Sequence, residues 1–157
     1  MLRKKSKRHF YIVTVIVVLL VIWTAWSNTT VGITHYTVAS DKLPASFDHY
    51  SIVVVSDLHN AEFGENNSQL IKLIEKEKPD IIVITGDLVD SNKTNIDIAQ
   101  KLVGTLTGIA PCYYVTGNHE AWLGEQYQEL ESILLDEGVA ILHDRGSGII
   151  FFANKRE

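Results

Sequence analysis

The chain has 157 residues, of which 46% are hydrophobic and 21% charged, a composition typical of one globular domain of ordinary size. Its net charge of -5 is unevenly distributed, because five basic residues fall within the first eight positions and the remainder carries 9 basic and 19 acidic residues. An acidic body argues against nucleic-acid binding through a basic face. The single cysteine, Cys112, excludes a disulfide within the chain and a zinc site built on cysteines, and we expect it to be a small core residue.

The first predicted element is a transmembrane anchor over residues 10–27. Its first 17 residues carry no charge, which is at the short end of what a spanning helix requires. Basic residues precede this run and none follows it until Lys42, so the positive-inside rule places a tail of residues 1–9 in the cytoplasm and the domain outside it. A secretory signal cleaved near residues 25–27 is the alternative, and it also places the domain outside the cytoplasm.

Residues 28–50 are predicted to be a linker, or to contribute an edge strand over 31–38. Beyond them, β-branched apolar runs alternate with segments of helical periodicity. This alternation predicts an α/β fold with a parallel sheet and right-handed crossovers, and continuously apolar runs are typical of strands covered on both faces. The strands are expected at 51–55, 81–84, 112–115 and 139–142, the helices at about 67–78, 94–106 and 125–137, and a turn and returning strand at 145–148 and 149–152.

Polar motifs follow the first three of these strands at nearly equal spacing. Asp87 comes 30 residues after Asp57, and Asn118 another 31 residues later, which is the length of a strand, a crossover helix and a return. The carboxyl ends of parallel strands meet at one edge, where open α/β sheets build their sites, and carboxylate, imidazole and amide groups gathered there suit a metal ion. The full motifs are Asp57-Leu58-His59, Gly86-Asp87-Leu88-Val89-Asp90 and Gly117-Asn118-His119-Glu120.

Each motif taken alone has an ordinary structural explanation. Asp57 could cap a helix, Gly86 and Asp87 could form a turn, and Asn118 could occupy left-handed backbone. Order, spacing and position after buried strands agree for all three motifs, which makes coincidence improbable.

Together the three motifs resemble those of the calcineurin-like metallophosphoesterase family, over about residues 51–142. The membrane segment resembles the membrane-associated bacterial branch of that family, which includes UDP-2,3-diacylglucosamine pyrophosphohydrolase-like members. The resemblance implies that residues 51–157 are a partial phosphoesterase domain, the N-terminal half of an αββα sandwich preceded by one transmembrane helix. It also implies hydrolysis of phosphate monoesters, diesters or pyrophosphates of an envelope or lipid-linked substrate, through a water activated by two metal ions.

The resemblance further implies roles for individual residues. Asp57 and His59 would bind the first metal ion, Asp87 would bridge both ions, and Asn118 would bind the second through its side-chain oxygen. His119 would face the substrate, stabilising phosphoryl oxygens or protonating the leaving group. The two divalent ions would be Mn²⁺, Fe or Zn²⁺. The implied partners are a phosphoester substrate and the membrane, without nucleic acid.

The chain departs from the family pattern after His119. The family supplies further imidazoles from a Gly-His and a Gly-His-x-His motif, whereas only His143 follows here, where we expect a surface turn. The sequence therefore predicts the N-terminal part of a larger enzyme, inactive or nearly so as an isolated chain. Asp90 is expected beside the site rather than as a ligand, and the role of Glu120 stays open.

Other functions compete with this interpretation. A truncated, non-catalytic, membrane-anchored protein could keep one cation as a structural plug, and a nucleotide phosphodiesterase would use the same metal core. A Rossmann domain and a serine hydrolase are weaker alternatives, because their Gly-x-Gly-x-x-Gly and Gly-x-Ser-x-Gly signatures are missing from the sequence.

Overall fold

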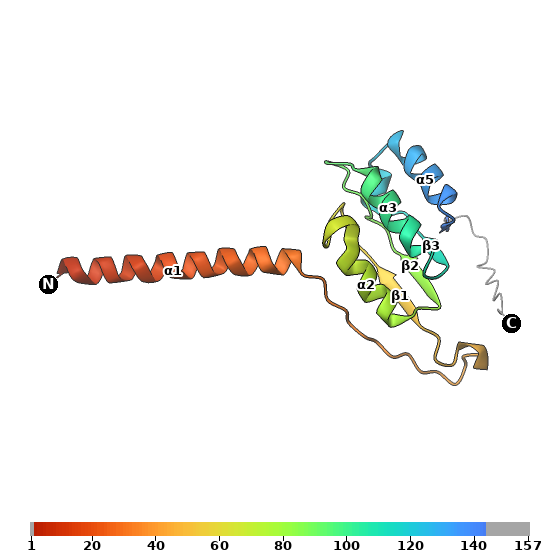
Figure 1. Ribbon diagram of the computed structural model, residues 1–157, viewed down its shortest axis with the longest axis horizontal. Coiled ribbons are helices and arrows are strands. Elements are labelled where there is room, and N and C mark those ends of the chain that lie inside the picture. The colour runs from red at the N-terminus through yellow and green to blue at the C-terminus, as the bar shows by residue number, and fades with distance from the viewer. Residues whose placement is uncertain (1, 144–157) are drawn as a thin grey trace.

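The computed structural model describes residues 2–143, which form a long N-terminal helix, a linker and an α/β domain (Figure 1). Helix α1 spans Leu2–Thr29 and projects away from the domain. Its segment Lys7–Thr24 is long and apolar enough to cross a membrane, and none of it is buried against the protein. A cleaved signal near the N-terminus would meet the same criteria of length and composition. A helix that is apolar all round and uncovered by protein is suited to lipid rather than to water.

The linker that follows α1 contains no strand. Residues 30–50 hold only a 3₁₀ turn, η1, at Ala45–Phe47, so the edge strand predicted over 31–38 is wrong. The β-branched residues there favour extended backbone, but a strand also needs a paired neighbour, and the linker finds none in the described part of the chain. The linker contacts the domain at individual residues: Val31 packs against the core, and His35 Nδ1 lies 3.7 Å from Glu77 Oε2.

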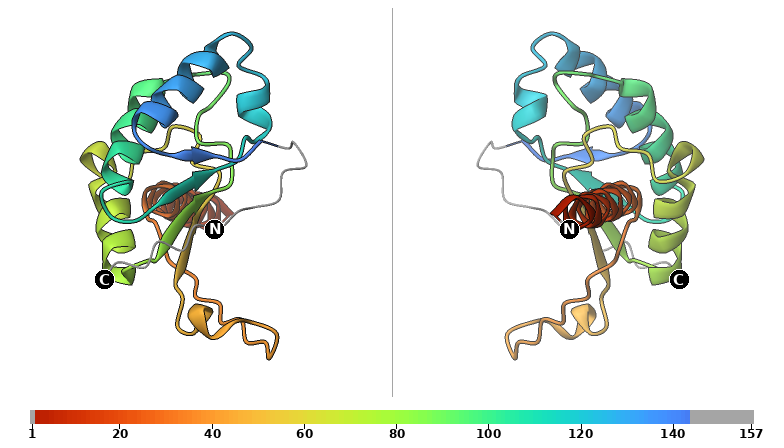
Figure 2. Two further views of the ribbon diagram at one scale, coloured as in Figure 1. Left: turned by 90° about the vertical axis from the view of Figure 1, so that its right-hand side faces the viewer. Right: turned by 90° about the vertical axis from the view of Figure 1, so that its left-hand side faces the viewer.

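Four parallel strands form one sheet in the order β1-β2-β3-β4. Right-handed crossovers between strands in sequential order place every connecting helix on the same face, and Figure 2 shows the helices gathered on one side of the sheet. The predicted α/β class and parallel sheet are confirmed. The strands are β1 (Ile52–Val55), β2 (Ile81–Ile84), β3 (Cys112–Tyr114) and β4 (Ala140–Ile141), and the helices are η2 (Glu65–Asn67), α2 (Ser68–Glu77), α3 (Ile96–Leu106), α4 (Asn118–Ala121) and α5 (Gln126–Asp136).

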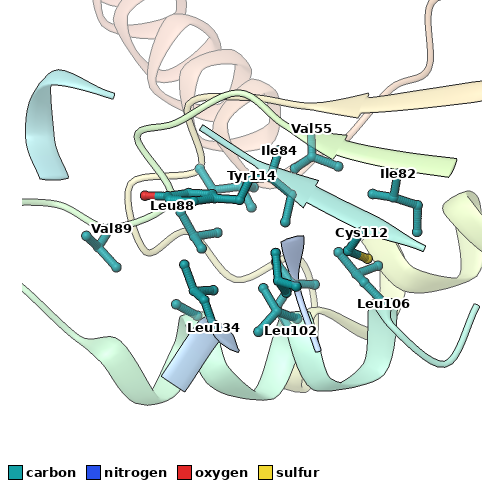
Figure 3. Close-up of a cluster of buried hydrophobic side chains, with 14 of the residues drawn as sticks. Val55, Ile82, Ile84, Leu88, Val89, Leu102, Leu106, Cys112, Tyr114 and Leu134 are labelled. Atoms are coloured by element: carbon teal, nitrogen blue, oxygen red, sulfur yellow. The ribbon is translucent and has the colours of Figure 1, made fainter. Parts of the chain in front are cut away.

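The core lies between the sheet and these helices (Figure 3). Alternate strand residues point into it, and its members are almost fully buried. Cys112 is one of them, at 2% exposure, which confirms its expected role as a small core residue. Among the labelled residues, the strands contribute Val55, Ile82, Ile84 and Tyr114, and the helices contribute Leu102, Leu106 and Leu134.

The opposite face of the sheet is apolar and is open at β1. Ile52 and Val54 of β1 are 53% and 60% exposed, whereas Val55, which belongs to the core, is 6% exposed. The prediction that this strand is covered on both faces is therefore wrong within the described residues, because all the helices lie on the other side. An apolar second face is what a second sheet covers in a sandwich, so the observed layers are consistent with one half of the predicted αββα arrangement.

The ends of the predicted elements differ slightly from the observed ones. The third and fourth strands are shorter than expected, and the one-turn helix α4 was not predicted. Asn67 precedes α2 with left-handed backbone, and its Oδ1 accepts a hydrogen bond from Phe63 N instead of capping the helix. The predicted turn at 145–148 and strand at 149–152 lie outside the described residues.

Candidate metal centre

Three loops meet at the carboxyl edge of the sheet. Asp57 and His59 follow β1, Asp87 follows β2, and Asn118 follows β3. Backbone hydrogen bonds join the first two loops, from Asp57 N to Gly86 O at 3.3 Å and from His59 N to Asp87 O at 2.9 Å. The parallel ladder thus continues into the loops and holds the motif residues at adjacent positions.

Asp57, His59 and Asp87 form a candidate cation site. Each offers one ligand atom, and these atoms all lie within 4.8 Å of one another. Two ligands at about 2.1 Å from one ion are at most about 4.2 Å apart, so small side-chain rotations bring all three into range. Asp57 is exposed and Asp87 is buried, which leaves the site open on one side. The donor set of two carboxylates and an imidazole fits Mn²⁺, Fe or Zn²⁺.

Left-handed backbone occurs at all three candidate ligands and at five further non-glycine residues of the described chain. Asp57, His59 and Asp87 have φ angles of 54°, 48° and 50°, in a region that aspartate and histidine enter more readily than most residues other than glycine. Such conformations cost about 1–3 kcal/mol each and persist where neighbouring structure enforces them, most often at functional sites. The Gly86-Asp87 pair does form the turn that its sequence favours, with Gly86 at φ 91°.

His119 lies against this group from the adjacent loop. Its backbone N–H donates to Asp87 Oδ1 at 2.8 Å, and its ring stands edge-on to that of His59, with centroids 4.3 Å apart. Ser91 N–H donates to its Nδ1 at 3.1 Å. Because a backbone N–H can only donate, the neutral ring carries its proton on Nε2. His119 therefore presents an N–H donor, and the exposed Trp122 ring lies 5.2 Å from its own.

Asp90 lies beside His119 rather than among the candidate ligands. Its Oδ1 accepts a hydrogen bond from Asn92 N at 2.7 Å and is 3.8 Å from His119 Nδ1. The Asn92 N–H bond is the main cause that holds the pKa of Asp90 below its usual value, and the His119 ring acts in the same direction. Asp90 is thus close enough to His119 for its carboxylate to interact electrostatically with the imidazole ring.

Asn118 begins α4 and does not adopt the left-handed backbone that was its alternative interpretation. It is exposed, and it sits between two residues that touch Asp87. His119 N bonds to Asp87, and a Cβ added at Gly117 would lie 2.3 Å from Asp87 Oδ1. The backbone of Asn118 therefore lies between two residues that are close to the Asp87 carboxylate.

Glu120 is the residue of this site that sequence reasoning did not assign. It is fully buried, and its carboxylate accepts four backbone N–H bonds from the loops after β2 and β3. The only signal in the sequence was its place after Asn118 and His119. The backbone N–H groups that donate to it are brought together only where two distant loops meet, which residue patterns do not show.

His143 has the surface position expected of it. It is half exposed, and its Nε2 lies 3.1 Å from Glu131 Oε1 on α5. It does not contribute to the group formed by Asp57, His59 and Asp87.

Comparison with known proteins agrees with this geometry. The sequence model of the calcineurin-like phosphoesterase family matches residues 50–152. A protein of Aquifex aeolicus (strain VF5) named "uncharacterized metallophosphoesterase" is 36% identical over 91 residues, covering 57% of this chain and 34% of the relative. A Bos taurus protein named "transmembrane protein with metallophosphoesterase domain" is 29% identical over 157 residues, covering 99% of this chain and 35% of the relative.

A third relative, a Bacillus subtilis (strain 168) protein named "uncharacterized metallophosphoesterase YkuE", is 38% identical over 95 residues, covering 55% of this chain and 32% of the relative. The chain spans about a third of the length of these three relatives. The family match covers more than half of the chain and includes all three motif loops. The chain therefore belongs to the calcineurin-like phosphoesterase family.

Proposed function

We propose that this chain contributes the metal-binding loops of a membrane-anchored phosphoesterase, in which Asp57, His59, Asp87 and Asn118 hold two divalent ions. The observation that carries the proposal is the convergence of the Asp57, His59 and Asp87 ligand atoms within 4.8 Å at the carboxyl edge of the sheet. When bound there, divalent ions supply Lewis acidity toward phosphoryl oxygens and lower the pKa of a water. The bonds cleaved would be phosphate monoesters, diesters or pyrophosphates.

His119 is the proposed catalytic residue. Its Nδ1 is occupied by the Ser91 N–H, so the Nε2–H remains to donate to a phosphoryl oxygen or to the leaving group. The hydrogen bond from its backbone to Asp87 fixes the histidine beside the proposed bridging carboxylate. This arrangement places the proton donor and the metal ligands on adjoining loops.

Location at a membrane is the second part of the proposal. We assign residues 1–9 to a cytoplasmic tail, 10–27 to the anchor, 28–50 to the linker and 51–157 to the phosphoesterase domain, which would lie outside the cytoplasm. The apolar helix α1 and the Bos taurus relative named as a transmembrane protein support the anchor. A domain tethered this way would meet phosphoesters at the cell envelope, including lipid-linked ones. Protease digestion of the domain in intact cells that express the chain tests its orientation.

The enzymatic proposal is tested by counting bound Mn²⁺ and measuring hydrolysis of bis(p-nitrophenyl) phosphate. We expect the full chain in detergent micelles to bind Mn²⁺ and to hydrolyse the diester slowly, and Asp87→Asn to lose both properties. Asp136→Asn is the matched control, because it neutralises an exposed carboxylate on α5 and should retain both.

The same experiment distinguishes the phosphoesterase from the competing function, a non-catalytic metal-binding protein. Binding of one ion that raises the unfolding temperature, with no hydrolysis above the Asp87→Asn background, would favour the non-catalytic metal-binding protein. Failure of the wild-type chain to bind Mn²⁺ would contradict both functions.

A further inference from the structure

The Glu120 carboxylate is fully buried at the junction of two loops. Its Oε1 accepts N–H bonds from Leu88 at 2.7 Å and Val89 at 3.2 Å. Its Oε2 accepts N–H bonds from Asp87 and Gly117, both at 2.8 Å. Each oxygen thus accepts from two backbone donors.

The four donors belong to the segments that carry the candidate metal ligands. Three are consecutive amides of the loop after β2, beginning with Asp87 itself, and the fourth is Gly117, which directly precedes Asn118. One side chain therefore fixes the backbone of both loops with respect to each other. Asp87 itself adopts left-handed backbone at φ 50°, which aspartate tolerates better than most residues other than glycine.

The two loops are packed so closely that neither can move toward the other without steric overlap. A Cβ at Gly117 would lie 2.3 Å from Asp87 Oδ1 and 2.5 Å from Asp87 N, and a Cβ at Gly86 would lie 2.4 Å from Gly117 N. Any relative shift of the loops must therefore move the Asp87 carboxylate. No ion pair with a cationic side chain neutralises Glu120 among the residues that the structure describes.

We propose that Glu120 is a positioning residue of the metal centre, which sets divalent-cation affinity by holding the Asp87 loop against the Asn118-His119 loop. The inference rests on the proposed function, because it assumes that these loops bind the ion. Removal of a hydrogen-bonding partner behind metal ligands lowers metal affinity by about 10–100-fold. Glu120→Gln keeps the volume of the side chain but turns an N–H donor toward two of the four backbone donors, so we expect at least a tenfold rise in the Mn²⁺ dissociation constant.

The test compares Mn²⁺ affinity by electron paramagnetic resonance with unfolding temperature in EDTA, for the full chain in micelles. Leu134→Ala is the matched control, since it removes a fully buried side chain from α5, away from the loops. We expect Leu134→Ala to lower the unfolding temperature while its Mn²⁺ affinity stays within twofold of wild type. Glu120→Gln that binds Mn²⁺ as wild type does, while unfolding earlier, would show a structural role alone and overturn the inference.

Hydrogen exchange of the wild-type chain provides a second test that needs no variant. The amides of residues 87–89 and 117 should exchange slowly, and Zn²⁺ should slow both segments together. If they exchange as fast as the exposed linker at residues 36–39, the inference is wrong even if Glu120→Gln does not fold. Absence of Mn²⁺ binding by the wild-type chain would instead contradict the proposed function, so the two failures are distinguishable.

Discussion

A methyl group at Gly86 should destabilise the domain more than one at any other glycine with a positive φ. Gly86 has φ 91°, and an added Cβ would lie 2.4 Å from Gly117 N and 2.5 Å from Gly117 Cα. Left-handed backbone costs a residue with a Cβ about 1–2 kcal/mol. Overlap with immovable backbone adds about 1–3 kcal/mol. We therefore expect Gly86→Ala to lower the free energy of unfolding by about 2–5 kcal/mol.

Two other glycines separate these contributions. Gly124 has φ 61° and no atom within 4 Å of an added Cβ, so Gly124→Ala should show the conformational cost alone. Gly117 has φ -93°, but its Cβ would meet Asp87 Oδ1 at 2.3 Å, so Gly117→Ala should show the steric cost alone. The Gly86 variant combines both costs at one position.

The assay is urea unfolding of the full chain in micelles, followed by circular dichroism, with free energies from linear extrapolation. Helix α1 remains helical in the micelle and contributes a constant signal. A loss in Gly86→Ala no larger than that in Gly124→Ala would refute the claim that the two loops are in backbone contact.

Three further predictions use the same unfolding assay. The buried Tyr114 hydroxyl makes no hydrogen bond of normal geometry, and its pKa is raised mainly by burial and secondly by the charge of Glu120. Tyr114→Phe should therefore leave the free energy of unfolding unchanged or raise it by about 1 kcal/mol. A loss larger than about 1 kcal/mol would reveal a hydrogen bond to Glu120. Burial raises the pKa of Cys112 from 9.0 to about 11, so the thiolate forms at lower pH in the unfolded chain than in the folded one. The contribution of the buried thiol to the free energy of unfolding is therefore fully present below pH 9 and is lost between pH 9 and 11. The loss should reach about 3 kcal/mol and be absent in Cys112→Ala, and an equal loss in that variant would contradict the assignment. In β1, Val54→Thr should change stability by less than about 0.5 kcal/mol and Val55→Thr should cost about 1–3 kcal/mol, because these side chains are 60% and 6% exposed; equal effects would mean that the open face is covered.

The strands and the main helices could be predicted from the sequence because their patterns leave few alternatives. Short β-branched runs such as 81–84 are fully apolar, and the helix at 96–106 repeats its apolar residues with helical spacing. The equal spacing of the motifs then placed Asp57 and Asp87 on adjacent loops, which the structure brings together.

Other features depended on contacts between distant segments. The β-branched residues at 31–38 favour a strand, but no neighbour in the described chain pairs with them. Helix α4 has four residues, too few for any periodic signal. The left-handed backbone at Asp57 and the buried role of Glu120 arise only where the loops meet, so no local pattern reveals them.

The measurement that tests the central claim most directly is a Mn²⁺ titration of the full chain and of Asp57→Asn, His59→Ala and Asp87→Asn, with Asp136→Asn as control. If the three loops form a divalent-cation site, wild type and Asp136→Asn bind Mn²⁺ alike, and each of the other variants binds at least tenfold more weakly. Equal binding by wild type and Asp87→Asn, or no binding by wild type, would contradict the account.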